Sequence, residues 1–514
     1  MHIKKAIFML VAAFLILSLF IFNFTKTDAS ARVVYAYATH DYSGDNSSYN
    51  SFVNNESHIN YVITFTYGID ENGNLNGEED DAVKDEAIKN NVVPLLLIHN
   101  IRGGTFDNSL IHAVLSNETA KSNLIDNIEN AAIKGGYKGV NIDFENVGYV
   151  DRQNYNQFLS DLKSKLTSDN LLLTVAIPAM TADSPNSLWA GGFDYKAISS
   201  IVDKVIIMAY DQHWSGGNSG PICSFQWLQN VAQYATSTID KDKIVMGLPA
   251  YGYDWSLSGT TSVTEDEVKS LINTYGGNAM WDNTSKEPYY IYYKNGIKHT
   301  VWFENSYSFK LKLDYLSSIG IDDISFWKLG YENQDFWKVI EGNTVDYFGD
   351  IFASWARNDI NDMARLKYVS GYSDGTYRPN NYITRAEFIT LLLRVKGIKE
   401  EPGEGFWDTQ QSFAKDAIAT AKKLGIVNGY SDGSFRPNNK ISREEIAAII
   451  AKAYGYEPYA DSKFVDIENS FAKNDIIALS NRGIISGYDT YHFMPKNYAT
   501  RAEATAILYR LINK

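Results

Sequence analysis

The sequence is poor in cysteine and in positive charge. Cys223 is its only cysteine, which excludes an intrachain disulfide and a zinc site built on cysteine pairs. Lys and Arg number 47 against 61 Asp and Glu, a net charge of −14. Nucleic acid is therefore an unlikely partner, because phosphate binding draws on Lys and Arg. The length of 514 residues and an ordinary 45% of hydrophobic residues predict a soluble chain of several domains.

The composition also lacks the apolar excess of a many-span membrane protein, and its long apolar run stands near the N-terminus. Lys4 and Lys5 precede seventeen uncharged residues, 6–22, and Ala29-Ser30-Ala31 has the small-x-small form of a signal-peptidase site. We therefore expect residues 1–31 to be an export signal peptide. An uncleaved anchor is the alternative, since the run is longer than a usual signal core and shorter than the ~20 residues that span a bilayer.

Beyond about residue 343 the sequence consists of three copies of one unit. Each copy predicts an amphipathic helix, a Gly-rich turn such as 429–437, and a second helix. One unit is too small to bury a core alone, so we expect the copies 343–402, 403–461 and 462–514 to pack together. The positions that recur every 58 residues include Asp350, Asp408 and Asp466; Trp355, Phe413 and Phe471; and Arg385, Arg443 and Arg501.

The second helix of each copy begins with a capping box, as in Ser442-Arg443-Glu444-Glu445. Capping explains the hydroxyl and the last Glu. It does not explain an Arg at the first helical position, where a cation opposes the helix dipole. An anionic ligand held by the three arginines and by backbone N–H groups would resolve this conflict.

These repeats resemble the S-layer homology domain, through the signature Thr384-Arg385-Ala386-Glu387 and the turn 429–437. The resemblance covers residues 343–514 and implies an all-α pseudo-threefold module that binds anionic, often pyruvylated, secondary polymers of the bacterial cell wall. The third copy departs from the pattern at 487–495, which lacks the Asp-Gly pair and the Arg before Pro, so we expect its groove to be the weakest. The resemblance places Arg385, Arg443 and Arg501 at the ligand groove, with Asp350, Trp355, Asp408 and Asp466 as further contacts.

Upstream, residues 32–342 alternate short β-rich runs with helical patterns, such as those at 154–166, 224–239 and 308–320. Eight such units over ~300 residues predict an α/β fold, the (β/α)8 barrel. An open doubly wound sheet would need a Gly-x-Gly-x-x-Gly after the first strand, and none follows Tyr37. The expected strands are 33–37, 61–65, 92–98, 139–145, 171–177, 204–210, 244–249 and 324–327.

One gap between expected strands is longer than the others, from Tyr251 to about Trp302. Its run of tyrosines at 289–293 is followed by Lys294-Asn295-Gly296, which predicts a hairpin. We therefore expect a small insertion after strand seven, on the side of the barrel where active-site loops emerge.

The fourth expected strand, 139–145, carries the strongest chemical signal. Its strict alternation points Val140, Ile142 and Phe144 toward packing helices, and Asn141, Asp143 and Glu145 toward the barrel interior. Glu145 stands at the C-terminal rim, where barrel enzymes react. Two acids facing a core cost stability that a structural polar cluster could avoid, which favours catalysis.

This strand resembles the signature of glycoside hydrolase family 18, Asp-Gly-x-Asp-x-Asp-x-Glu, read here from Lys138 to Glu145. The last two acidic positions match and the first two do not. The segments 208–211, 247–252 and 325–327 match further motifs, so the resemblance spans residues 32–341. The spore-cortex-lytic and related wall glucosaminidases resemble this chain most, since they share Asn-Ile-Asp-x-Glu.

The resemblance implies a substrate-assisted retaining mechanism that uses no metal and no cofactor. The carbonyl oxygen of the sugar's own 2-acetamido group attacks, while Glu145 protonates the leaving oxygen and later activates water. Asp143 holds the acetamide N–H and Tyr210 the acetamide oxygen. The implied substrate contacts are Asp211, Trp327, Asn141, Met208 and Tyr251. Structural alternatives are core packing for Tyr210 and Trp327 and a helix cap for Asp211.

Together these features predict an exported, envelope-anchored hydrolase of β-1,4-linked N-acetylglucosamine polymers, either peptidoglycan or chitin. Two other interpretations of the sequence are a chitinase-like binding protein that has lost its activity and a structural surface-layer subunit. The pairing of Glu145 with Asp143 and Tyr210 argues against both.

Overall fold

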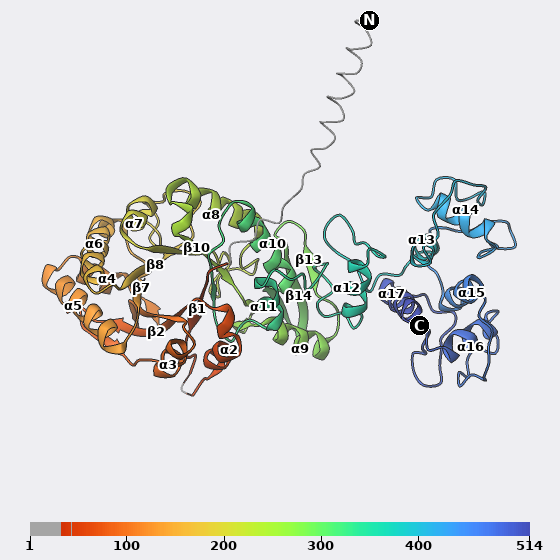
Figure 1. Cartoon of the computed structure of the whole chain (residues 1–514), viewed down its shortest axis with the longest axis horizontal. Helices are drawn as coiled ribbons and strands as arrows, with labels where there is room; N and C mark the ends of the chain where they lie inside the picture. Colours follow the sequence, from red (N-terminus) through yellow and green to blue (C-terminus); the bar gives the residue numbers. More distant parts are fainter. Residues whose placement is uncertain (1–31, 43) are drawn as a thin grey trace, which may run out of the picture.

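The computed structural model describes residues 32–42 and 44–514, so the expected export segment 1–31 lies outside the described residues. Three parts follow one another along the long axis of the molecule, a barrel, an antiparallel sheet beside it and a group of helical repeats (Figure 1). Within the described ranges, no helix has both the length and the apolar character needed to cross a membrane.

Eight parallel strands close into a barrel, which confirms the predicted (β/α)8 fold. Their order is β1-β16-β10-β9-β8-β7-β4-β2, and β1 pairs in turn with β2. The short β3 (Leu75–Gly77) adds an antiparallel edge to β2. The barrel strands are β1 (Val34–Ala38), β2 (Tyr61–Ile69), β4 (Val93–His99), β7 (Gly139–Asp143), β8 (Leu172–Pro178), β9 (Lys204–Met208), β10 (Ile244–Pro249) and β16 (Ile324–Trp327).

Helices surround the barrel and bury the outward side chains of its strands. Phe144, which follows β7, stacks on Phe158 of α6 with ring centroids 5.7 Å apart. The helices expected at 154–166, 224–239 and 308–320 are confirmed as α6, α8 and α10. The surrounding helices are α2 (Ser47–Asn55), α3 (Asp81–Lys89), α4 (Asn108–Leu115), α5 (Glu118–Gly135), α6 (Arg152–Ser168), α7 (Tyr195–Ile201), α8 (Phe225–Thr238), α10 (Ser306–Ser318) and α11 (Gln334–Ile340).

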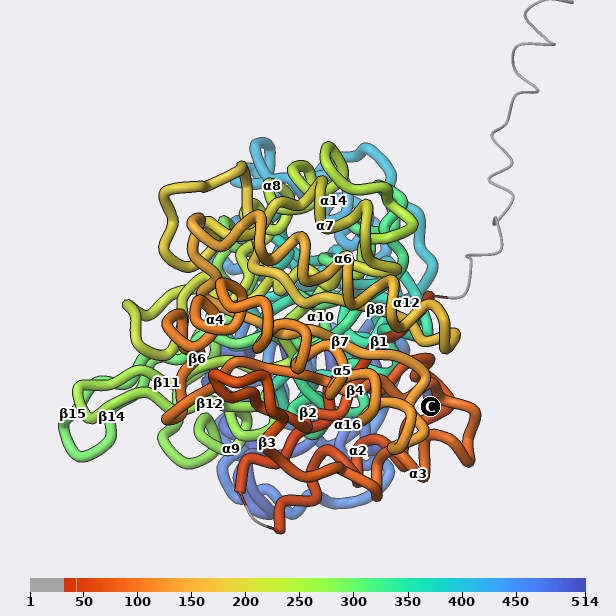
Figure 2. Tube along the Cα trace, turned by 90° about the vertical axis from the view of Figure 1, so that its left-hand side faces the viewer, coloured from red at the N-terminus to blue at the C-terminus, as the bar shows by residue number. Residues whose placement is uncertain are grey.

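The insertion after β10 is larger than a hairpin. It forms a five-stranded antiparallel sheet in the order β12-β11-β15-β14-β13, with helix α9 (Glu265–Tyr275). The expected hairpin is confirmed as β14–β15, which turns at Asn295 and Gly296, both at positive φ. Seen from the barrel end, this hairpin projects sideways (Figure 2). The strands are β11 (Gly252–Ser256), β12 (Gly259–Val263), β13 (Met280–Asp282), β14 (Glu287–Lys294) and β15 (Ile297–Phe303).

The three repeats form one closed helical module with a common core. Isolated bridges join Tyr382 to Thr500, Thr384 to Lys440 and Ser442 to Tyr498, so each copy contacts both others. The predicted capping boxes at α13, α15 and α17 are all present. The helices are α12 (Arg357–Arg365), α13 (Arg385–Val395), α14 (Lys415–Lys423), α15 (Arg443–Tyr454), α16 (Lys473–Asn481) and α17 (Arg501–Ile512).

Candidate active site

The site stands at the end of β7. The strand ends at Asp143, two residues earlier than expected, but the alternation continues because Phe144 is fully buried among the helices. Asn141 and Asp143 are buried on the opposite face, and the Asn141 amide donates to Thr174 Oγ1 at 2.8 Å. Glu145 follows at the rim. The strand therefore presents one buried carboxyl beneath one at the mouth of the barrel.

The backbone of Glu145 is held by a residue that the sequence analysis missed. The amide of the fully buried Asn100 accepts from the Glu145 N–H and donates to the Glu145 carbonyl, both at 2.9 Å. Asn100 comes directly after β4, so a polar residue ending an apolar run was the available signal. Because both groups of one peptide segment are bound, Glu145 has a fixed position at the rim.

A second missed residue is Trp189, whose indole Nε1 lies 3.5 Å from Glu145 Oε2. It belongs to the irregular segment between β8 and α7, which has no periodic pattern that could have indicated its position. Trp189 is 41% exposed, so this contact with the acid lies at the surface of the barrel.

Burial changes the acidity of both carboxyls. It raises the pKa of Asp143, and burial together with the negative charge of Asp143 raises the pKa of Glu145. Glu145 therefore keeps its proton near neutral pH, as a general acid requires. Burial alone disfavours the charged form of Asp143, and Glu145 is an acidic neighbour.

A cleft of about 220 Å³ opens above the two acids. Seven of the eight residues expected at the site line it, and Asn141 lies beneath. At its base, buried oxygens of Tyr37, Asn141 and Asp143 have no hydrogen-bond partner within the described chain. Such unpaired polar atoms indicate a place prepared for a polar ligand. The residues that sequence reasoning missed here are Tyr37, Phe65, Ile101, Phe106 and Tyr253.

Asp211 is fixed by the insertion. The hydroxyls of Tyr251 and Tyr253 both donate to its carboxylate, the second at 3.1 Å. Its backbone has φ of 56°, and the helix that follows, α8, begins after Ser224. The helix-cap alternative is therefore wrong. Burial raises the pKa of Asp211, while the two tyrosine hydroxyls favour its charged form.

A buried ion cluster holds the loop that follows Asp211. The Glu287 carboxylate on β14 accepts from the backbone N–H groups of Ile222 and Cys223, at 2.9 and 2.8 Å. Lys312 on α10 pairs with both Glu287 and Glu304, and all three side chains are fully buried. The insertion thus holds this loop as well as Asp211 itself.

The signature arginines of the repeats are buried and have protein partners. Each Nε donates to a carbonyl of the next copy around the ring, as Arg385 does to Phe435 at 2.8 Å. Each guanidinium also faces the capping-box Glu of that copy, so the three ion pairs close a cycle. The pairs are Arg385–Glu445 at 2.8 Å, Arg443–Glu503 at 3.6 Å and Arg501–Glu387 at 3.3 Å.

The expectation of free backbone N–H groups at these helices was wrong. The N–H groups of Arg385 and Ala386 donate to the carbonyls of Asn439 and Pro437, and the other copies repeat this pattern. The third N–H is held by the cap. The first backbone N–H groups of each helix are therefore bonded to the neighbouring copy. An anion at the start of these helices would have to bind to side chains instead.

The recurring aspartates brace the turns. Asp350 accepts the N–H groups of Tyr377 and Arg378, both at 2.7 Å, and Asp408 and Asp466 do the same in their copies. These contacts give them a structural role beside the predicted one. Trp355 is different, since its side chain is 64% exposed and available to a ligand.

One groove of the module contains a cation without a partner. Its volume is about 400 Å³, and it is lined by Arg443, Glu503, Arg510 and Trp355 among others. Within the described chain, no hydrogen bond or ion pair involves the Arg510 guanidinium, although its charge partly opposes the rise that burial causes in the pKa of Asp359. The equivalent cations of the other two copies both have partners. Arg394 donates to the Tyr368 carbonyl at 2.9 Å, and Lys452 donates to Asn428 Oδ1 at 3.0 Å.

A closed (β/α)8 barrel with one carboxyl above another at its C-terminal rim is the arrangement of a barrel glycosidase. The chain belongs to the glycosyl hydrolases family 18, whose sequence profile matches residues 31–332. The S-layer homology domain matches residues 347–389, 406–447 and 463–505, which indicates association with the cell surface.

Three proteins illustrate the similarity. The uncharacterized glycosylase YvbX of Bacillus subtilis is 32% identical over 343 residues, 65% of this chain and 98% of the relative. The crystal structure of the Bacillus cereus spore cortex-lytic enzyme SleL matches with a TM-score of 0.58 and 30% identity, over 61% of this chain and 74% of that one. A crystal structure of a chitinase from Chromobacterium violaceum matches with a TM-score of 0.56 and 28% identity, over 60% of this chain and 98% of that one.

Proposed function

We propose that this chain is a wall-anchored hydrolase that cleaves β-1,4-linked N-acetylglucosamine polymers by a substrate-assisted retaining mechanism. The observation that carries the proposal is the position of Glu145, an acid kept protonated by burial at the rim, with Asp143 deeper on the same face. Asp143 comes from the same strand and lies beneath Glu145, so it is poorly placed to attack a sugar across the cleft. The other carboxylate, Asp211, is engaged by two tyrosine hydroxyls.

The sugar therefore supplies the nucleophile. Glu145 gives its proton to the glycosidic oxygen as the C1–O bond breaks, and the acetamido carbonyl oxygen bonds to C1 to form an oxazolinium ion. Asp143 accepts the acetamide N–H and stabilises the positive charge, and Tyr210 binds near the acetamide oxygen. Water, deprotonated by the Glu145 carboxylate, then opens the ring with net retention.

Peptidoglycan is the substrate that the anchor favours, because a chain bound to the wall stands beside it. The 30% identity with a spore cortex-lytic enzyme supports this choice. Chitin is the second candidate, supported by the chitinase similarity at 28% identity. Digesting peptidoglycan and chitin in parallel under the same conditions will separate them by the rate of reducing-end release.

The decisive variant is Glu145→Gln, which keeps the shape and removes the proton. We expect reducing-end release to fall by about 10²–10⁴-fold. The matched control is Glu118→Gln, an exposed residue of α5 that does not line the cleft, which we expect to leave turnover unchanged. Turnover retained in Glu145→Gln would contradict the proposal. Fully deacetylated chitosan must not be cleaved, because it lacks the attacking group.

The anchoring half of the proposal rests on the groove that contains Arg510. An anionic group of the wall polymer would pair with its free guanidinium, so Arg510→Gln should weaken sedimentation with purified cell walls roughly 5- to 10-fold. Arg365→Gln is the control, since Arg365 is an exposed residue already paired with Asp362. Equal binding by both variants would contradict the anchoring role of this groove.

A further inference from the structure

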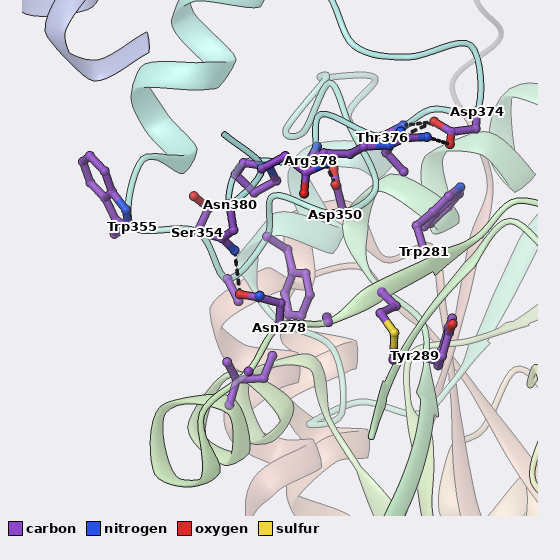
Figure 3. A pocket seen from close by; sticks show the side chains of 18 of the residues that line it. Asn278, Trp281, Tyr289, Asp350, Ser354, Trp355, Asp374, Thr376, Arg378 and Asn380 are labelled. Atoms are coloured by element: carbon purple, nitrogen blue, oxygen red, sulfur yellow. Dashed lines mark hydrogen bonds and ion pairs between the residues drawn. The ribbon is translucent and has the colours of Figure 1, made fainter. Parts of the chain in front are cut away.

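A second cleft, of about 620 Å³, lies where the insertion of the barrel meets the first repeat (Figure 3). Asn278, Met280 and Tyr289 line it from the insertion, and Trp355 and Asn380 line it from the repeat. Figure 3 shows Trp355 at one end and Tyr289 at the other, with the two asparagines between them. We call this space the junction cleft.

The two walls of the junction cleft are held together by a built interface. Phe352 of the first repeat belongs to the core of the insertion, with its ring centroid 5.2 Å from that of Phe303. Arg357 at the start of α12 pairs with Asp335 of the barrel helix α11 at 2.8 Å. The cleft is therefore a fixed feature of the fold rather than a gap between independent domains.

The first repeat differs from the others where the insertion contacts it. A Cβ on Gly349 would lie 2.4 Å from the Trp281 ring, so only glycine admits this contact. The equivalent residues of the other copies are Trp407 and Val465, which are 71% and 67% exposed. One copy of the three is thus adapted to the barrel.

The chemistry of the junction cleft suits neutral sugars. Its charged groups are already satisfied, since Arg378 pairs with Asp374 at 2.8 Å and Asp350 accepts two backbone N–H groups. The side chains of the two asparagines are hydrogen-bonded to each other, with Asn380 Nδ2 donating to Asn278 Oδ1 at 2.6 Å. Within the described chain this leaves the Asn278 N–H groups and the Asn380 oxygen for a ligand. The exposed ring of Trp355 and these amide groups together suit the recognition of a sugar.

Trp355 connects the junction cleft with the groove that contains Arg443 and Arg510, because it lines both. We propose that a wall polysaccharide whose anionic group is held at Arg510 continues past Trp355 into the junction cleft, where Asn278 and Tyr289 bind its neutral sugars. The catalytic half of the chain thereby takes part in anchoring. This inference rests on the proposed anchoring function and names a further subsite for it.

The test compares polymer fragments of increasing length, released from cell walls of the producing bacterium, on the full chain. Arg510→Gln should weaken binding of every fragment. Asn278→Ala should leave the shortest fragments unaffected and weaken the longer ones roughly 3- to 10-fold, the effect of one or two lost hydrogen bonds. Trp355→Ala should weaken all lengths, because Trp355 lines both spaces. Asn130→Ala, an exposed asparagine of α5, is the matched control.

Two results would overturn the inference while leaving the anchor intact. The first is that Asn278→Ala and Met280→Ala both bind long fragments as tightly as the unchanged chain does. The second is a loss for Asn278→Ala that is the same at every fragment length, which would indicate a loosened interface. If the unchanged chain binds no fragment and no wall, the anchoring proposal falls, and the inference falls with it.

Discussion

The barrel cleft and the repeat module treat buried charge in opposite ways. In the cleft, Asp143 has a buried oxygen without a partner, and burial raises its pKa. In the module, the Arg385 guanidinium donates to a carbonyl and pairs with a carboxylate. Arg443 and Arg501 make the same two contacts. Buried charges are normally paired. The unpaired acid therefore marks chemistry, and the paired arginines mark assembly.

The comparison also holds inside each region. The barrel has a paired cluster of its own at Lys312, which fixes a loop and touches no cleft. The module has an unpaired cation of its own, Arg510, and it faces a groove. Within the described chain, Asp143 and Arg510 therefore share two features, a polar atom without a hydrogen-bond or ion-pair partner and a place in the lining of a cleft or groove.

Among the variants that test this comparison, Asp143→Asn should have the largest effect. Turnover should fall by about 10²–10³-fold, because charge stabilisation of the oxazolinium ion is lost. Stability at pH 8 should not fall. Because the pKa of Asp143 is raised in the native state, its contribution to the unfolding free energy is greatest at low pH and falls as pH rises through that pKa. The Asn variant does not titrate, so its stability lacks this fall. Activity assays with thermal unfolding at pH 5 and pH 8 measure both; a lower melting temperature at pH 8 would break the comparison.

The paired arginines should respond in the opposite sense. Arg385→Met leaves the half-buried Glu445 without its cation, so we expect the module to lose about 2 kcal/mol of unfolding free energy while turnover is unchanged. Arg436→Met removes an exposed pair with Asp432 and should change stability little. Calorimetry of the full chain resolves the module. Equal stability of the two variants would show that Arg385 is not structural.

Adding a third acid should sharpen the account of the cleft. Asn141→Asp places a carboxyl beneath Asp143, which raises the pKa of Asp143 further because like charges oppose ionisation. The acidic limb of the kcat/KM profile should then move to higher pH by about one unit. An unchanged profile would refute the coupling of these two positions.

The smallest expected effect concerns Trp189→Phe. Its indole N–H favours the charged form of Glu145, so removing it should raise the pKa of Glu145 and move the basic limb to slightly higher pH. Turnover on wall glycan should fall roughly 3- to 10-fold through the lost contact. A fall in turnover without any movement of the basic limb would assign Trp189 to substrate binding alone.

Sequence patterns were sufficient for the repetitive parts of this chain. The eight strands follow from apolar runs, and the three copies from a strict 58-residue spacing. The alternation of β7 placed Asp143 and Glu145 correctly, because a strand directs neighbouring side chains to opposite faces. Trp189 and Tyr253 were missed, since they reach the site from segments whose local pattern does not indicate where they lie. Asn100 was missed although it is the polar residue that ends the apolar run of β4.

Sequence reasoning misjudged the start of the repeat helices for the same reason. A helix read alone has free N–H groups at its first turn, and an Arg there suggests an anion. The neighbouring copy satisfies these groups instead, and its Glu pairs with the Arg. No single repeat contains that information, because both partners lie in another copy, 60 residues away for Arg385 and Glu445 and 114 for Arg501 and Glu387.

The sequence by itself determined the barrel, the threefold module and the acidic strand, since periodicity and spacing are local properties that any stretch of chain carries. The tertiary structure decided which polar groups remain unpaired, that Gly349 admits Trp281 and that the insertion and first repeat enclose a cleft. These depend on contacts between distant segments. Hydrogen bonding and burial are settled only when those segments meet, and that meeting distinguishes a reactive acid from a structural one.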